Sequence, residues 1–352
     1  MLGRLLVISF VSLAMSFGAS AQSDAPAKSP PKQPAKYAGE KGASPIKVRV
    51  NEVIVPVTVT DQKGRFVSNL EKPDFKIFDQ GEQQKIEYFT AERNQPVVIG
   101  FLIEQSNSMR LHWKRFRETA IELVLALMPE DPKFSGYLIT YSNDAELAVD
   151  TTWEPSPILD SIREMKPGGG SALYDAIYMS CTNRELVEGE PIEPRRVLVI
   201  MGDGHDNSSS HTLDEVLEIA QRNLVTIYAI STVVFEFDGE HENTLQRLAR
   251  ETGGRVEYPL DDVYDDIAGY LSKPQDAGNY AITVGTGGYG AHIAEGMFRA
   301  IAALSGEITT QYILRYRPDV NDDPKIFRKI RVEVNLPNVK IRHRNGYYPY
   351  AP

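Results

Sequence analysis

The spacing of hydrophobic positions changes twice along the chain and divides it into three parts. From residue 46 to 92, apolar residues alternate with polar or small ones, most clearly between Val53 and Val59, which predicts half-buried β-strands. From 95 to about 272, continuous apolar runs alternate with segments of helical spacing. Strand-like alternation returns between 309 and 348. The pattern therefore predicts a central α/β domain with β-segments on both sides of it.

Two apolar runs mark the centre of the predicted α/β domain. Val97–Ile103 reads VVIGFLI and Arg196–Met201 reads RVLVIM, and such runs are typical of strands buried on both faces of a parallel sheet. The segment Thr212–Asn223 predicts a helix, which Thr212 can cap together with Glu215 in a capping box. Strands that alternate with helices imply a doubly wound, mostly parallel, Rossmann-like sheet with helices on both faces.

The flanking β-segments each have too few strands to be stable separately. In the first segment, residues 75–77 and Lys85–Phe89 are predicted strands, and in the second, Thr310–Arg317 and Lys329–Asn335 alternate well. Chain ends often lie close together, and an inserted domain is tolerated there. We therefore expect both segments to combine in one small β-sandwich into which the α/β domain is inserted.

The patterns also predict domain boundaries. These are a signal peptide at 1–21, a linker at 22–45, the first part of the β-sandwich at 46–92, the α/β domain at 95–272, a glycine-rich insertion with a helix at 273–308, and the second part of the β-sandwich at 309–348. The stretch 273–292 is interpreted as a mobile insertion. Its GTGGYG run imitates a phosphate-binding loop, but no Gly-Lys-Ser/Thr follows it.

The first 45 residues predict export. Arg4 precedes an apolar run from Leu5 to Phe17, and residues 19–21 (Ala-Ser-Ala) form a small-residue cleavage site. The alternative is an uncleaved anchor, which the shortness of the apolar run disfavours. Residues 22–45 are rich in Pro, Ala and Lys, as in a flexible linker. We therefore expect a periplasmic or extracellular protein with no transmembrane segment after cleavage.

Composition narrows the classes of partner. The formal net charge is −10, which disfavours a nucleic acid as partner because such proteins usually present a basic face. Cys181 is the single cysteine, so an intramolecular disulfide is impossible. Its helix-like surroundings favour a small buried residue over a reactive thiol.

Oxygen-bearing side chains follow the two buried strands. Glu104, Ser106 and Ser108 come after the first run, and Asp203 comes after the second. In a doubly wound sheet, ligands bind in the crevice outside the carboxyl ends of the strands, so both loops are expected to open onto it. A third loop, 168–171, ends in Ser171 before a predicted helix. This all-oxygen set suits Mg²⁺, Mn²⁺ or Ca²⁺ better than zinc.

Three motifs in this order resemble the metal-ion-dependent adhesion site of von Willebrand factor type A domains. They are EQSNSM at 104–109, GGGSALYDA at 168–176 and VLVIMGDGHDNSS at 197–209. The resemblance spans roughly 95 to 270. It implies hydroxyl ligands at Ser106, Ser108 and Ser171 and an acid at Asp203, with Glu104 in place of the family's leading aspartate. The flanking segments also resemble exported VWFA-related proteins of Acidobacteria.

Glu104 is the departure from the family pattern. Its extra methylene moves the carboxylate by roughly 1.5 Å in a site where Mg–O distances lie near 2.0–2.1 Å. In the family this acid usually acts through a water, which the longer side chain is able to displace. The alternative is a metal-free crevice in which Glu104 points to solvent or pairs with Arg110.

The favoured function is a non-enzymatic, adhesion-type protein-binding module that holds Mg²⁺ or Mn²⁺, with Ca²⁺ less favoured. An acidic side chain of a protein partner would complete the coordination, and the predicted rim residues are Asn107, Met109, Gly170 and His205. One alternative is a metal-free envelope scaffold that binds through the β-sandwich. A metal-dependent hydrolase is disfavoured because the sequence has no Gly-x-Ser-x-Gly nucleophile turn or second metal cluster.

Two further acidic or histidine-containing segments are interpreted as solvated. His205, Asp206 and His211 lie near the predicted crevice, but they lack the paired spacing of a zinc site. Residues 261–266 contain four aspartates but lack the ligand order of a calcium loop.

Overall fold

The computed structural model describes residues 52–91, 93, 95–187, 194–232, 244–259, 287–318, 323 and 325–349. The predicted signal peptide and linker, the aspartates at 261–266 and most of the predicted insertion lie outside the described residues. Among the helices of the described ranges, none combines the length and the apolar character that crossing a membrane requires.

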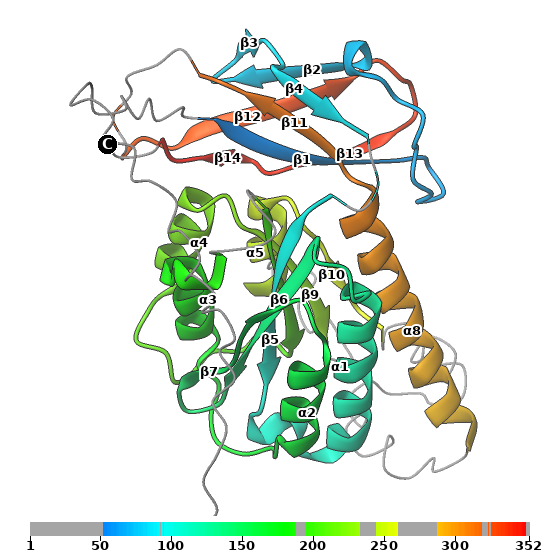
Figure 1. Ribbon diagram of the computed structural model, residues 1–352, viewed down its shortest axis with the longest axis vertical. Coiled ribbons are helices and arrows are strands. Elements are labelled where there is room, and N and C mark those ends of the chain that lie inside the picture. Colours follow the sequence, from blue (N-terminus) through cyan, green and yellow to red (C-terminus); the bar gives the residue numbers. More distant parts are fainter. Residues whose placement is uncertain are drawn as a thin grey trace, which may run out of the picture. The chain divides into compact units, whose positions relative to one another are not determined.

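The central sheet has six strands in the described part of the chain, and all but one are parallel (Figure 1). Their order is β10 (Val256–Glu257), β9 (Thr226–Ser231), β8 (Arg195–Gly202), β5 (Val97–Glu104), β6 (Phe134–Tyr141) and β7 (Ala145–Thr152). The edge strand β7 runs antiparallel to β6. Every residue of β5 is buried, as its continuous apolar run predicts for a strand covered on both faces.

Helices cover both faces of this sheet, as Figure 1 shows. One face packs against α1 (Trp113–Leu127), α2 (Ser156–Glu164) and α8 (Gly287–Thr310). The other face packs against α3 (Leu173–Thr182), α4 (Leu213–Arg222) and α5 (Thr244–Thr252). The predicted capping box is present at the start of α4, where the hydroxyl of Thr212 accepts from the backbone N–H of Glu215. Cys181 lies in the second of these cores, and burial raises the pKa of its thiol to about 12.

The two ends of the described chain combine in two four-stranded antiparallel sheets. The first has the order β13 (Lys340–Arg342), β1 (Val53–Thr60), β11 (Tyr312–Tyr316) and β4 (Tyr88–Thr90). The second has the order β14 (Gly346–Tyr347), β12 (Arg328–Val334), β2 (Phe75–Asp79) and β3 (Glu82–Gln84). Pairing of β1 with β11 and of β2 with β12 joins residues far apart in the chain. Both sheets contribute to one apolar core, which confirms the predicted sandwich and the fold class.

Two local predictions were wrong, and one strand was missed. The predicted strand Lys85–Phe89 is mostly a connection, because residues 85–87 link β3 to β4 in the other sheet and only the last two residues of the prediction lie in β4. The missed strand is β14, which has too few residues to show alternation. The mobile insertion predicted at 273–292 extends too far along the chain, because α8 already begins at Gly287. Once a helix is anchored by packing downstream, each added residue gains one hydrogen bond, and this extends it through unfavourable glycines.

Strand β1 is buried on both faces rather than half-buried, because its second face lies against a polar cluster. Thr58 Oγ1 donates to Glu307 Oε1 at 2.9 Å, and Glu307 in α8 is completely buried. Arg342 Nη2 donates to the other carboxylate oxygen of Glu307 at 2.8 Å, and Arg255 Nε lies 3.5 Å from that oxygen. Glu307 thus connects the sandwich to the end of α8 and to the central sheet.

Candidate functional site

The carboxyl ends of β5 and β8 bring two of the predicted loops together. Ile103 pairs with Met201 in the parallel ladder, so the next residues of both strands leave the sheet side by side. Glu104 closes β5 and is completely buried. Its Oε2 accepts a hydrogen bond from the backbone N–H of Asp203 at 2.8 Å. Glu104 therefore neither points to solvent nor pairs with Arg110, so this orientation, which was expected for a metal-free crevice, is wrong.

Gly202 creates the space that the longer side chain of Glu104 needs. A Cβ on Gly202 would overlap with Oε2 of Glu104 and lie 2.5 Å from the hydroxyl of Tyr141. The absence of a side chain on β8 therefore lets the carboxylate cross from β5 to the loop after β8. The missing side chain of Gly202 thus makes room for the extra methylene that Glu104 has and an aspartate at this position would lack.

Gly202→Ala is expected to lower the free energy of unfolding by about 1–3 kcal/mol, because an overpacked core displaces its neighbours. Urea unfolding followed by circular dichroism measures the loss. Gly168→Ala is the matched control, because a Cβ there would meet nothing closer than Arg110 Nη2 at 3.8 Å. Equal stability of the two variants would show that Glu104 does not depend on this space.

The predicted hydroxyl residues form a chain of short contacts that ends on Asp203. Ser106 Oγ lies 2.6 Å from Ser108 Oγ, which donates to Asp203 Oδ2 at 2.8 Å. Asp203 Oδ1 accepts from the backbone N–H of His205 at 2.8 Å and lies 3.2 Å from the Nδ1 of that residue. Ser106 is buried, whereas Ser108 is exposed, so the chain runs from the core to the surface of the crevice.

The third loop joins the other two through backbone and amide groups. Ser171 Oγ donates to the carbonyl of His205 at 2.8 Å, and the N–H of Ser171 donates to Asn207 Oδ1 at 2.9 Å. The N–H of Asn107 donates to the carbonyl of Gly169 at 3.1 Å. All five predicted ligand residues therefore belong to one connected site. In the structure, however, the hydroxyl of Ser171 contacts the third motif rather than the other hydroxyls.

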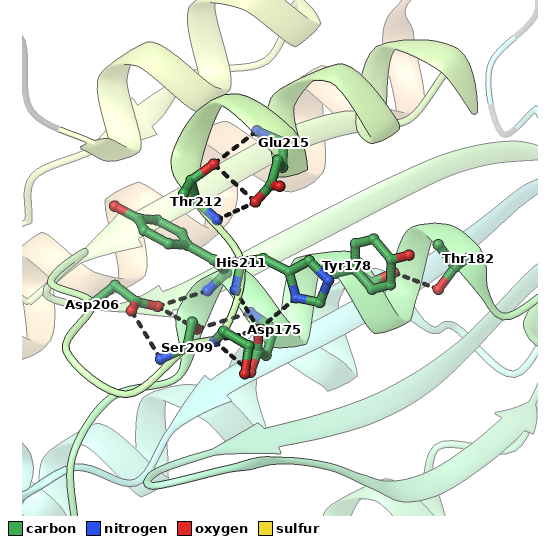
Figure 2. A network of polar contacts seen from close by, with 10 residues as sticks. Asp175, Tyr178, Thr182, Asp206, Ser209, His211, Thr212 and Glu215 are labelled. Atoms are coloured by element: carbon green, nitrogen blue, oxygen red, sulfur yellow. Dashed lines mark hydrogen bonds and ion pairs between the residues drawn. The ribbon is translucent and has the colours of Figure 1, made fainter.

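Asp206 and His211 are only partly exposed, contrary to the prediction of a solvated loop, because they bind the loop after β8 to α3 (Figure 2). Asp206 Oδ2 accepts from the N–H of Tyr174 at 2.8 Å, which satisfies a free donor in the first turn of α3. His211 Nδ1 lies 2.7 Å from Asp175 Oδ1, and its ring stacks on Tyr178 with 3.7 Å between centroids. A polar loop between a strand and a helix gives no sequence signal that distinguishes these contacts from solvation.

Burial dominates the electrostatics of Glu104. Desolvation, followed by the nearby charge of Asp203, raises the pKa of Glu104 to about 7. Glu104 Oε1 and the Tyr141 hydroxyl are buried polar atoms without a well-formed hydrogen bond among the described residues, although the hydroxyls of Ser106 and Ser171 lie close enough to Glu104 to oppose the rise in its pKa. An unpartnered buried carboxylate oxygen is costly, so this position favours a proton or a cation.

The donor set fits a hard divalent cation. Adjacent oxygens around octahedral Mg²⁺ lie about 3 Å apart, since each Mg–O distance is about 2.0–2.1 Å. The separations of 2.6 Å between the two serine hydroxyls and 2.8 Å from Ser108 to Asp203 Oδ2 are close to this spacing. No cluster of three or more His, Cys, Asp or Glu side chains with metal-binding geometry occurs in the described ranges. A cation at this site would therefore depend on serine hydroxyls as well as on the two acids.

Three of the four predicted rim residues lie where a partner could reach them. Asn107 and His205 are exposed, and Gly170 is partly exposed. The prediction that Met109 lies on the rim was wrong, because this residue is 6% exposed and belongs to the apolar core that includes α1. The 3₁₀ turn Asn107–His112 (η2) follows Ser106 directly, and it places Met109 in the core.

Comparison with known proteins agrees with this geometry. The family model of the von Willebrand factor type A domain matches residues 99–268. No curated protein matches the chain in sequence.

Similar solved structures are distant. An aerotolerance-related membrane protein from Bacteroides fragilis has 16% identity, a TM-score of 0.36, and coverage of 46% of this chain and 90% of that one. A von Willebrand factor type A protein from Catenulispora acidiphila has 10% identity, a TM-score of 0.41, and coverage of 80% and 75%. Proximal thread matrix protein 1 of the mussel byssus, whose metal-ion-dependent adhesion site (MIDAS) motif is occupied by zinc, has 12% identity, a TM-score of 0.41, and coverage of 66% of this chain and 50% of that one.

The order of the sheet, the three converging loops and the family match lead to one assignment. Residues 99–268 form a von Willebrand factor type A domain.

Proposed function

We propose that this protein is an exported, non-enzymatic binding module whose crevice captures a protein partner through a divalent cation. Ser106, Ser108 and Asp203 would hold Mg²⁺ or Mn²⁺, with Glu104 and Ser171 beside them. An acidic side chain of the partner would supply the remaining oxygen. Domains of this family often mediate protein–protein interaction, which supports the class of function.

The observation that carries the proposal is the run of closely spaced oxygens from Ser106 through Ser108 to Asp203. These atoms lie near the spacing of neighbouring ligands around Mg²⁺. Exposure of Ser108 leaves a side of the site open to a partner. Two acids and a divalent cation would balance in charge, which would offset the repulsion between Glu104 and Asp203.

Export is supported by the sequence of the first 21 residues, which lie outside the described part. The apolar run Leu5–Phe17 and the small residues that follow it are typical of a secretory leader. An envelope location would place the crevice where adhesion partners are found.

A metal-free scaffold is the second candidate, and one observation favours it. The contacts from Ser108 to Asp203 Oδ2 and from the Asp203 N–H to Glu104 Oε2 hold the loops together without a cation. In that case, the partner would bind elsewhere, for example on the sandwich, and chelation would have no effect on its capture.

Capture of the partner from the envelope fraction of the source cell separates the two candidates. Full-length immobilised protein is expected to retain a partner in Mg²⁺ or Mn²⁺ and to lose it in chelator. Asp203→Asn is expected to lose the same partner in every buffer, because the amide lacks the charge that holds the cation. Asp160→Asn is the matched control, since Asp160 is an exposed acid on α2 that pairs with Arg163. Retention of the partner by Asp203→Asn, or in chelator, would favour the scaffold.

A further inference from the structure

A second polar site lies where the strands of the central sheet begin, at the edge opposite the crevice. A cavity of about 110 Å³ separates the starts of β8 and β9 from strand β1 of the sandwich. Ile54 and Pro56 of β1 form one wall, and Leu224 and Asn223 after α4 form part of another. This volume exceeds the roughly 30 Å³ that one water occupies in the liquid, so the cavity has room for a small ligand.

Three arginines line this cavity, and none of its lining residues is acidic. Arg195 donates to Gln311 Oε1 and to the carbonyl of Ile308, each at 2.8 Å. Arg344, which is 2% exposed, donates to the carbonyl of Leu224 at 2.8 Å. Arg196 donates to Asn223 Oδ1 at 3.2 Å and to the carbonyl of Ser180 at 3.0 Å. The acceptors are therefore neutral, which is unusual for buried guanidinium groups such as those of Arg195 and Arg344.

Helix ends explain part of this arrangement but not all of it. Ile308, Ser180 and Leu224 lie at or just after the carboxyl ends of α8, α3 and α4, where the helix dipole carries about half a negative charge. Three such ends leave a net positive charge on three arginines. The Nε atoms of Arg195 and Arg344 are also buried without a hydrogen-bond partner among the described residues. The neutral acceptors thus bind Nη atoms of Arg195 and Arg344 but leave their Nε atoms without a hydrogen bond.

The positive charge persists at neutral pH. Burial lowers the pKa of Arg195 and that of Arg344 to about 10 each, which still leaves both guanidinium groups protonated near pH 7. A buried, uncompensated charge is among the least favourable groups in a protein interior. An anion in the cavity would compensate it.

The wall of the cavity also contains strained backbone. Leu224 has a φ of +53°, in the left-handed region that a branched side chain rarely adopts. Its carbonyl accepts the hydrogen bond of Arg344. Strain of this kind persists only where surrounding contacts hold it, and it is frequent at ligand sites.

We propose that this cavity binds a small tetrahedral oxyanion, of the size of phosphate or sulfate, between Arg195, Arg196 and Arg344. Planar guanidinium groups match the oxygens of such anions in paired hydrogen bonds. The apolar residues Ile54, Val197 and Leu224 complete the lining and restrict its size. The bound anion would join the sandwich to the α/β domain, independently of any metal in the crevice.

Thermal unfolding of the full chain in low millimolar phosphate tests the proposal, with chloride at equal ionic strength as reference. A saturable rise in Tm on the order of several degrees is expected, because an anion that binds only the native state stabilises it. Calorimetric titration with inorganic phosphate is expected to give one site. Arg344→Met removes the charge at similar volume and should abolish both effects. Arg163→Met, at an exposed arginine of α2, should retain them.

Selenate in crystals of the unaltered protein keeps the test decisive if Arg344→Met does not fold. An anomalous peak within hydrogen-bond distance of Arg344 and Arg195 is expected. Absence of both the saturable rise and the peak would overturn the proposal, as would an equal rise in the Arg344→Met and Arg163→Met variants. Stabilisation by acetate but not by phosphate would assign a carboxylate instead, and this would also overturn it.

Discussion

Replacement of Glu307 by alanine is expected to lower the free energy of unfolding by about 3 kcal/mol, the lower end of the range for breaking a buried ion pair. Glu307 is completely buried and accepts hydrogen bonds from Arg342 and Thr58. Its loss would leave Arg342 and Arg255 without their shared acid. Because both arginines are partly exposed, water would compensate some of this loss.

Glu333→Ala is the control for this prediction. Glu333 pairs with Arg331 on an exposed face of the sandwich, and such surface pairs contribute about 0–1 kcal/mol. Urea unfolding of the two variants measures the difference between a buried and an exposed Glu–Arg pair. A loss below about 1 kcal/mol in both variants would show that Glu307 does not hold the sandwich and the α/β domain together.

Stability in metal-free buffer is expected to fall by about 3 kcal/mol between pH 4.5 and 7, owing to Glu104. Its pKa is 4.5 in its ordinary state and about 7 in the fold, and each pKa unit corresponds to 1.36 kcal/mol. The folded state therefore binds the proton more tightly than the unfolded chain does. This contribution is fully present below pH 4.5 and is lost as the pH rises through about 7.

Glu104→Gln should remove this slope, because the amide keeps the shape and an acceptor for the N–H of Asp203 but cannot titrate. Unfolding midpoints in urea at pH 5 and pH 7.5, with chelator present, provide the comparison. Parallel pH profiles for the unaltered protein and Glu104→Gln would contradict the burial of a high-pKa carboxyl at the end of β5. Asp203 and Glu104 interact, so the profile belongs to the pair.

Much of the fold follows from hydrophobic spacing. The apolar runs of β5 and β8 predict strands covered on both faces, and their loops do meet at one edge of the sheet. The pairing of β1 with β11 follows from the strand deficit at each end of the chain. Spacing reports which faces of an element are buried, so these features are visible in the sequence.

The details of the site depend on contacts across the fold, which spacing does not report. Gly202 has no side chain and therefore no pattern, yet it makes room for Glu104. Met109 follows a polar loop, but a 3₁₀ turn places it in the core. Asp206 and His211 resemble solvated loop residues until α3 is placed beside them. The residue types at the site were predictable, whereas the partner of each polar atom was not.

Manganese binding measured by electron paramagnetic resonance, with calorimetric titration alongside, tests the central claim most directly. The full chain is expected to bind one Mn²⁺ in the crevice, and Mg²⁺ is expected to displace it. Asp203→Asn and Ser108→Ala should each lose this binding, whereas Asp160→Asn should retain it. Absence of binding at millimolar Mn²⁺, or equal binding by Asp203→Asn, would contradict a metal-dependent crevice.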